Sequence, residues 1–438
     1  MLTIAALATI ITVMVLLILN KVTPVAALCA VPVVASLAVG FGPEEISGFF
    51  ESGLERVAGV AIMFIFAILF FGVLQDAGLF RPMIDGIVRL TKGNVVLVVI
   101  GTALVGMLAH LDGAGATTFL LTIPALLPVY RRLNMSPLLM LLVLVTGAGI
   151  FNMLPWAGPL GRASAVTDLD VTELWRPLIV IQGLGAGALV LLAVGLGLRE
   201  RRRVAAAAAS GAAPDSSDLR SPLAESSVLD ETLLRPGNMV PNAVLFFAVM
   251  VALIIGILPA GLIFMLGFSV ALTLNYPNVK IQLERISAHA GPAMMLASVI
   301  LAAGVFLGVL EGSGMLRAMA DNLVAVMPEW LLPHLHILIG FFGLPLELVL
   351  STDAYYFGLL PVVIEVMQPL GVPDQSIVYA LMIGNIVGTF ISPFSASLWL
   401  ALGLSGISLG EHIKYSLMIM WGFSLVLFGF AWILGIFQ

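Results

Sequence analysis

The sequence predicts an all-α polytopic membrane protein made of two inverted-topology repeats of five spans each. Each repeat is expected to hold one re-entrant hairpin and one broken helix. Of the 438 residues, 61% are hydrophobic and only 10% are charged, against about 25% charged in soluble domains. Many apolar runs reach the roughly 18 to 20 residues that a span needs. The two halves also read as imperfect copies of each other, with polar breaks in matching places, which is typical of secondary transporters.

The repeat shows in two pairs of segments. FGVLQDAGLF at 71–80 matches LGVLEGSGML at 307–316, and LLPV at 126–129 matches LLPV at 359–362. The second offset also relates Asn152 to Asn385. Each half carries a lone acid within an apolar run.

The first repeat covers residues 1–198 and the second covers 239–438. The first is expected to hold three spans, an amphipathic stretch, a hairpin, a broken helix and a closing span, at 2–20, 23–41, 58–76, 79–92, 94–133, 138–165 and 177–198. The second follows the same order, at 240–256, 258–276, 293–311, 315–327, 332–370, 376–402 and 414–437. No basic residue precedes the first run, and the next follows at once, so it indicates a span and not a signal peptide.

The linker, 199–238, is rich in Ala, Ser and Pro and begins with an Arg-rich stretch, which predicts disorder. If it is cytoplasmic, every Lys and Arg except Arg56, Arg162, Arg176 and Arg317 lies on the inside. The positive-inside rule favours this topology, with both termini outside. The protein is therefore expected to be a multi-pass protein of the cell inner (plasma) membrane. The single Cys29 excludes an internal disulfide.

The first hairpin tip, HLDGAGATT at 110–118, places Asp112 inside the membrane. A charge there costs about 2.5–3.5 kcal/mol on insertion scales, so the carboxylate needs a partner, a proton or a cation. Thr117 and Thr118 follow as neutral ligands. The plainer interpretation is an acid at a wet loop end. His110 is interpreted as a polar residue satisfied within the hairpin.

The first broken helix contains NMLPWAGP at 152–159. Its two prolines and its glycine interrupt the helix, so freed carbonyls and a half-helix N-terminus can face an ion. Asn152, Gly158 and Pro159 are therefore predicted site residues. Arg162 either holds a substrate carboxylate in a bidentate fork or anchors the outer end of the span.

The second half offers Ser351, Thr352 and Asp353 at its hairpin tip. Its broken helix supplies neutral groups that suit a polyanion or a hard cation, at Asn385, Thr389, Ser392 and Ser395. Glu347, just before the tip, is a second buried-acid candidate, which a wet hairpin arm explains equally well.

These motifs resemble the citrate–metal–proton symporter family (CitMHS) of the ion transporter superfamily. The resemblance rests on LDGAGATT at 111–118 with Pro128, on 152–162, and on LSTDAYYFG at 350–358. It implies import of citrate complexed with Mg²⁺ or Ca²⁺, coupled to protons at Asp112 and Asp353, which would also face the metal. Through the related INDY-type dicarboxylate transporters it implies a homodimer with elevator-type movement. The family's first tip carries a second acid where this chain has Ala114, which leaves the metal's identity open.

The alternative is a proton- or sodium-coupled carrier of another di- or tricarboxylate without metal. A channel would need a continuous polar pore, whereas the polar residues here gather at two breaks. No serine elbow or Walker motif occurs, so neither an intramembrane hydrolase nor an ATP-driven pump has support. We expect no enzyme activity, no tightly bound cofactor and no nucleic-acid partner. The expected partners are the metal–citrate complex, protons, the lipid bilayer and a second copy of the chain.

Overall fold

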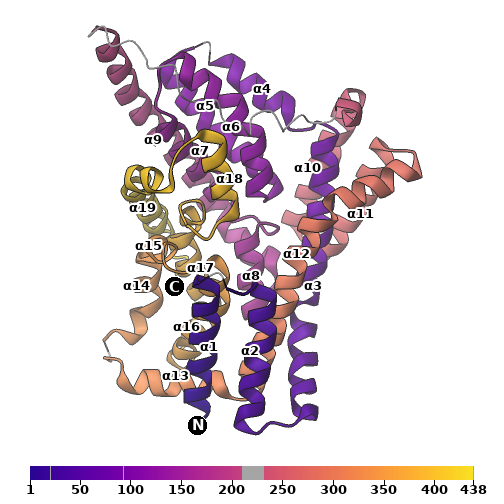
Figure 1. Ribbon diagram of the computed structural model, residues 1–438, viewed down its shortest axis with the longest axis vertical. Helices are drawn as coiled ribbons and strands as arrows, with labels where there is room; N and C mark the ends of the chain where they lie inside the picture. The colour runs from indigo at the N-terminus through magenta and orange to yellow at the C-terminus, as the bar shows by residue number, and fades with distance from the viewer. Residues whose placement is uncertain (20, 92, 210–230, 329, 438) are drawn as a thin grey trace.

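A computed structural model describes residues 1–19, 21–91, 93–209, 231–328 and 330–437 (Figure 1). Every secondary-structure element within these ranges is helical, which confirms the all-α prediction. Residues 210–230 of the predicted linker, and Lys92 of the predicted inside loops, lie outside the described residues.

The first half holds nine α-helices in the described residues. They are α1 (Leu2–Ile18), α2 (Pro24–Val39), α3 (Pro43–Asp76), α4 (Arg81–Leu90), α5 (Val95–Ala109), α6 (Gly115–Arg132), α7 (Pro137–Phe151), α8 (Gly158–Thr167) and α9 (Val171–Ala209). A 3-10 turn, η1 (His110–Asp112), joins the two hairpin arms α5 and α6. Two helical arms with a turn between them thus cover the predicted hairpin at 94–133, and the chain between α7 and α8 interrupts the helix predicted at 138–165.

The second half follows the same order with more interruptions. Its helices are α10 (Met239–Ile255), α11 (Ala260–Asn275), α12 (Val279–Gly312), α13 (Met315–Val326), α14 (Leu335–Phe341), α15 (Gly343–Leu346), α16 (Leu360–Met367), α17 (Asp374–Asn385), α18 (Ala396–Ser405) and α19 (Leu409–Ile433). The first arm of its hairpin is divided between α14 and α15, and the second arm begins with a π-helical segment, η5 (Ala354–Leu359). A 3-10 turn, η7 (Ile386–Phe390), extends α17.

Three helices extend beyond the predicted spans. Helix α3 begins at Pro43 instead of 58, and α12 at Val279 instead of 293. The predicted apolar span left out the start of α3 because that stretch contains acidic residues. Acidic residues in a first turn nevertheless favour a helix N-terminus, and α3 has Glu44 and Glu45 there. Helix α9 continues to Ala209, so the Arg- and Ala-rich head of the predicted linker is helical, as the helix propensities of Ala and Arg favour.

Membrane-spanning length is reached by six helical segments in the described part of the chain. They are Pro43–Asp76, Val95–Asp112, Val171–Ala208, Pro236–Ile255, Val279–Gly312 and Leu409–Ile433. The predicted spans at 2–20, 23–41 and 258–276 form shorter helices, with 17 residues in α1 and 16 in α2 and α11. The set of apolar helices agrees with a polytopic membrane protein.

Helices α3 and α12, each of 34 residues, pack along one another through bare backbone. A Cβ on Gly53 would lie 2.0 Å from the Gly304 carbonyl oxygen, and one on Gly308 would lie 2.2 Å from the Phe49 oxygen. Only glycine permits backbones to approach so closely. A Cβ on Gly183 or Gly187 of α9, in contrast, would meet nothing within 4 Å.

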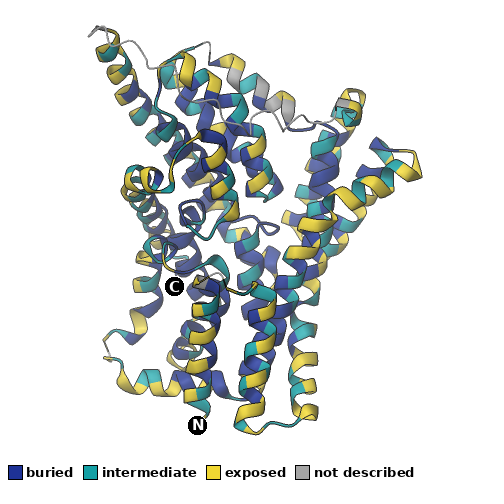
Figure 2. Ribbon diagram, viewed as in Figure 1, coloured by how far each residue is buried: buried dark blue, intermediate teal, exposed yellow. Residues whose placement is uncertain are grey.

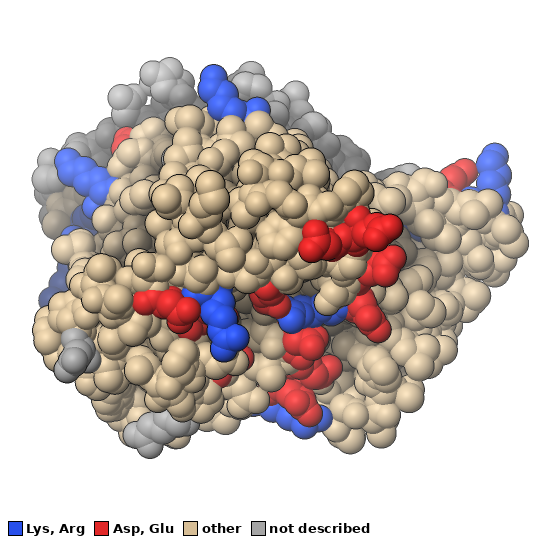
Figure 3. Space-filling view, turned by 90° about the horizontal axis from the view of Figure 1, so that it is seen from below, with Lys and Arg blue, Asp and Glu red and all other residues tan. Residues whose placement is uncertain are grey.

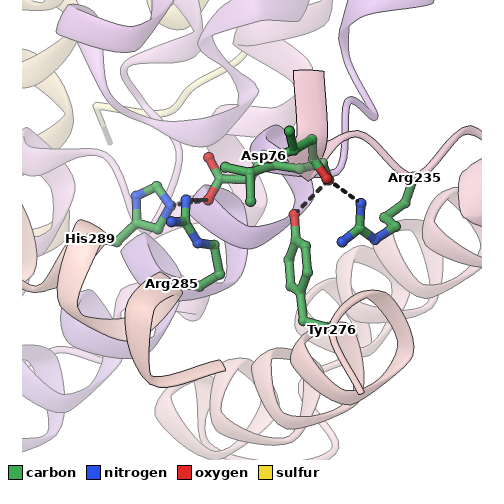
Figure 4. A network of polar contacts seen from close by, with 7 residues as sticks. Asp76, Arg235, Tyr276, Arg285 and His289 are labelled. Atoms are coloured by element: carbon green, nitrogen blue, oxygen red, sulfur yellow. Dashed lines mark hydrogen bonds and ion pairs between the residues drawn. The ribbon is translucent and has the colours of Figure 1, made fainter. Parts of the chain in front are cut away.

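The opposite end of this helix pair is held by charged side chains (Figure 4). His289 Nε2 and Arg285 Nη1 of α12 lie 2.7 and 3.4 Å from Asp76 Oδ2 at the end of α3. A Cβ on Gly72 would lie 2.5 Å from the His289 ring. The close contact at Gly72 and the ion pairs of Asp76 therefore lie at the same end of the helix pair.

Equivalent positions of the two halves make these contacts. A position in the first half matches the position 236 residues later in the second half, as 71 matches 307. By this match, the contact between Gly53 and Gly308 is equivalent to the contact between His289 and Gly72. In the same way, the contact between Phe49 and Gly312 is equivalent to the contact between Arg285 and Asp76. Each of these contacts therefore occurs twice along the α3–α12 pair. A position that lies on α3 in one contact has its equivalent on α12 in the other.

The two hairpins lie toward opposite ends of the molecule (Figure 1). Helices α5 and α6 lie in the upper part, α14 and α16 in the lower part, and the short helices α4 and α13 cross the two ends. Between them, α7, α8, α17 and α18 occupy the centre, where most residues are buried (Figure 2). Seen from below, acidic side chains outnumber basic ones (Figure 3).

Candidate functional site

The first hairpin tip packs against the first helix break. Gly113, with φ +71°, turns the chain from η1 toward α6, and a Cβ there would lie 3.0 Å from the Trp156 ring. The Trp156 indole donates a 2.8 Å hydrogen bond to the Leu111 carbonyl. Sequence reasoning did not select Trp156, although an aromatic residue flanked by Pro155 and Pro159 was a usable signal.

Asp112 is buried at this tip, and its carboxylate stabilises the start of α6. Its Oδ1 accepts a 2.9 Å hydrogen bond from the Ala114 amide, and its Oδ2 accepts one from the Thr117 hydroxyl. An acid at a helix N-terminus is favoured by the helix dipole. Both carboxylate oxygens therefore have protein donors.

A chain of polar side chains joins the first hairpin to both breaks. His110 pairs through Nδ1 with Thr118 Oγ1 at 2.8 Å and through Nε2 with Asn152 Oδ1 at 3.3 Å. Asn152 Nδ2 then donates to Thr389 Oγ1 in the second half, at 3.2 Å. His110, Thr118 and Asn152 are buried, so His110 is satisfied as the sequence suggested, but it also connects the predicted site residues.

An equivalent group stands in the second half. Asn385, at the start of the second break, donates from Nδ2 to Glu347 Oε1 at 2.6 Å and accepts from the Tyr356 hydroxyl at 3.3 Å. Each Asn therefore binds a side chain from the first arm of its hairpin, His110 or Glu347. In this arrangement Glu347 corresponds to His110. Asp112 and Asp353 do not make equivalent contacts, because Asp112 is bonded within its own tip and Asp353 is paired with Arg162 of the other half.

The two halves meet in an ion pair between Arg162 of α8 and Asp353 of the second tip. Arg162 Nε lies 2.7 Å from Asp353 Oδ1, and the two side chains are only 12% and 14% exposed. Arg162 is thus directed into the protein and is not an interfacial anchor. Gly158 makes room for it, since a Cβ there would lie 2.4 Å from Arg162 Nη1.

Both half-helices that follow the breaks begin without a side-chain cap. Helix α8 starts after Ala157, with Pro159 in its first turn, and α18 starts after Ser395. Their free backbone N–H groups and positive dipole ends are able to bind an anion. In α8, Arg162 lies within the same first turns.

The remaining predicted residues have local roles in this structure. Ser351 Oγ accepts from the Ala354 amide at 3.2 Å, and Ser392 Oγ accepts from the Phe394 amide at 3.4 Å. Thr352 and Ser395 are half-buried. Among the described residues no hydrogen bond joins Asp112 to Asp353, and no three His, Cys, Asp or Glu side chains form a group able to hold a metal.

The first hairpin also contacts the second break across the repeat boundary. A Cβ on Gly115 would lie 2.7 Å from Phe390 and 2.8 Å from Ser397. The His110 ring meets the Phe390 ring edge-on at 5.3 Å. Each hairpin therefore touches the opposite half, through Gly115 in one case and Asp353 in the other. The arrangement brings a carboxylate-binding arginine, neutral donors and buried acids to the centre of the helices.

Comparison with known proteins finds relatives along nearly the whole chain. The chain resembles the citrate transporter of Bacillus subtilis (strain 168), with 37% identity over 97% of this chain and 96% of that protein. It is 33% identical to the Mg(2+)/citrate complex secondary transporter of the same organism, over 92% of each.

Solved structures show a similar fold at low sequence identity. The Alcanivorax borkumensis YdaH transporter matches with a TM-score of 0.60 and 18% identity over 90% of each chain. Neisseria gonorrhoeae MtrF matches with a TM-score of 0.58 and 14% identity, over 86% of this chain and 81% of that one. The family model for citrate transporters matches residues 1–384. The chain therefore belongs to the citrate transporter (CitMHS) family of membrane proteins and is not an enzyme.

Proposed function

We propose that this protein imports citrate complexed with Mg²⁺ or Ca²⁺, together with protons, across the cell inner (plasma) membrane. The buried pair of Arg162 and Asp353 carries the proposal, because it joins the two halves beside the uncapped start of α8. An arginine is the preferred partner for a carboxylate. The metal-containing substrate is supported by the relative named as a Mg(2+)/citrate complex secondary transporter.

Asp353 has a clear role in this mechanism. In the empty site it compensates the charge of Arg162, so no unpaired charge is buried. A citrate carboxylate takes its place at Arg162, and the released Asp353 then faces the metal of the complex. Thr389, Ser392 and Ser395 supply neutral groups near the second break. Free citrate carries about three negative charges and the metal complex about one, which lowers the cost of desolvation.

The two-repeat architecture is part of this proposal. It is supported by the exchanged contacts of α3 and α12, by the paired groups around Asn152 and Asn385, and by hairpins at opposite ends of the molecule. We propose that α3 and α12 form the fixed part. The hairpins and broken helices, which pack on one another, move as the elevator in each subunit of a homodimer. The acidic lower face in Figure 3 suits the outside.

Re-entrance of the first hairpin is testable by labelling. In a Cys29→Ser background, Asn94→Cys and Arg132→Cys place single thiols at exposed positions near the ends of α5 and α6. We expect both to react with an impermeant thiol reagent from the same, cytoplasmic side. Labelling from opposite sides would show that one arm crosses the membrane.

Metal dependence tests the substrate. Purified protein in proteoliposomes should take up labelled citrate in proportion to the metal–citrate complex, and EDTA at constant citrate should reduce uptake at least about tenfold, about 1.4 kcal/mol. Readdition of Mg²⁺ or Ca²⁺ should restore it.

The alternative, a metal-independent carrier of a di- or tricarboxylate coupled to protons or sodium, predicts no effect of EDTA. One observation favours it. Asp112 already has donors on both oxygens, and the neighbouring position is Ala114, so the first tip offers few metal ligands. Undiminished uptake with EDTA would establish that alternative.

A further inference from the structure

We propose that Glu347 carries the co-transported proton, in place of Asp112 and Asp353. This inference rests on the proposed function, and it names the group that couples transport to the proton gradient. Glu347 follows α15 directly, on the first arm of the second hairpin.

The Glu347 carboxyl is fully buried and only half satisfied. Its side chain has no exposed surface, and its Oε1 accepts the 2.6 Å hydrogen bond from Asn385. Its Oε2 is buried and accepts no hydrogen bond of normal geometry from the described residues, although the Ser392 hydroxyl lies beside the carboxyl group. Because an unpaired buried charge is costly, a proton on Oε2 removes the cost without disturbing the bond at Oε1.

Asp112 and Asp353, the two acids that the sequence indicated, already have compensation. Asp353 is paired with Arg162 at 2.7 Å, and Asp112 accepts hydrogen bonds on both oxygens. Hydrogen bonds and an opposite charge favour the ionised form of a carboxyl group. Of these three carboxyl groups, Glu347 is the one with an oxygen free of hydrogen bonds, so a proton there breaks no existing contact.

Few charged groups act on this position. Arg162 of α8 and Asp353 of the second tip act on Glu347 electrostatically and oppose one another. Tyr355 and Tyr356 of η5 also lie close, with their hydroxyls donating to Leu381 O and Asn385 Oδ1. The other helices packed against α15 carry these titratable or charged groups: His336 on α14, Asp374 and Tyr379 on α17, and Glu411, His412, Lys414 and Tyr415 on α19.

This geometry links the proton to the substrate. When a citrate carboxylate binds Arg162, it displaces the Asp353 carboxylate from the ion pair. The bound citrate also adds negative charge beside Glu347. The added charge favours transfer of a proton from bulk water to Glu347 Oε2. By reciprocity the bound proton then favours the anion, so the two enter together, as symport requires.

The test compares Glu347→Gln with Glu365→Gln, a half-buried acid on the second arm of the same hairpin. Reconstituted full-length protein with an entrapped pH dye receives citrate and Mg²⁺. We expect Glu347→Gln to retain measurable citrate exchange, to lose proton influx at least tenfold, and to show citrate KM independent of pH. Glu365→Gln should behave as the wild type in all three. Proton influx per citrate in Glu347→Gln equal to that of the wild type would overturn the inference.

Two further results keep the inference testable if Glu347→Gln does not fold. Binding of Mg²⁺–citrate to the wild type, measured calorimetrically in buffers of different ionisation enthalpy, should take up protons. Glu347→Asp should retain this uptake with a shifted midpoint pH, and an unchanged midpoint would contradict the assignment. Citrate uptake by the wild type without proton influx would overturn this inference and leave citrate transport standing, whereas absent citrate uptake would refute the proposed function itself.

Discussion

Replacing Arg162 with glutamine should weaken citrate binding by at least about tenfold. The substitution removes the charged partner of both Asp353 and, in the proposed mechanism, the citrate carboxylate. A hydrogen bond to a charged group contributes about 1.5–3 kcal/mol, which corresponds to roughly 10- to 150-fold in affinity. We expect a rise in KM of at least that size, measured by labelled citrate uptake and by direct binding.

Arg56 provides a matched control. It also forms an arginine–carboxylate pair between the halves, with Arg56 Nη1 2.9 Å from Glu311 Oε1, but these side chains are 27% and 36% exposed. Because partly exposed ion pairs contribute at most about 1 kcal/mol, Arg56→Gln should leave citrate KM within about twofold. Equal effects of the two substitutions would show that Arg162 only holds the halves together.

Replacing Gly384 with alanine should strongly destabilise the second broken helix. A Cβ at Gly384 would lie 1.8 Å from the Gly340 carbonyl oxygen, where α17 crosses α14. The obstacle is backbone, so no side chain is able to move aside, and overpacking of this kind costs about 1–3 kcal/mol or more. Since Asn385 follows directly, we expect a lower Tm in detergent and loss of most citrate uptake.

Gly183→Ala is the corresponding control on α9. Gly183 meets nothing within 4 Å, so alanine fits there and improves helix propensity by up to about 1 kcal/mol. Its Tm and uptake should equal or slightly exceed those of the wild type. A Gly384→Ala protein with unchanged Tm would show that α14 and α17 separate easily at this crossing.

Sequence patterns alone were enough to predict the all-α membrane fold class and the places where polar residues interrupt the helices. Apolar runs and their polar interruptions are local features, and the breaks around Asn152 and Asn385 follow directly from them. The same local signals also indicated Arg162 and Asp353 as site residues. They could not give the true lengths of α3, α9 and α12, because charged residues outside the apolar core remain compatible with a helix.

Which polar groups are partners depends on how the helices pack in three dimensions. Asp353 pairs with Arg162 from the other half, and Glu347 pairs with Asn385 but keeps one oxygen without a partner. The positions where helix backbones approach each other, at Gly53, Gly304 and Gly384, were likewise not predicted from the sequence. The physical reason is that a buried charge is stabilised by whatever lies within a few ångströms in space. In this fold those neighbours are separated in sequence by 38 residues for Glu347 and Asn385 and by 191 for Arg162 and Asp353.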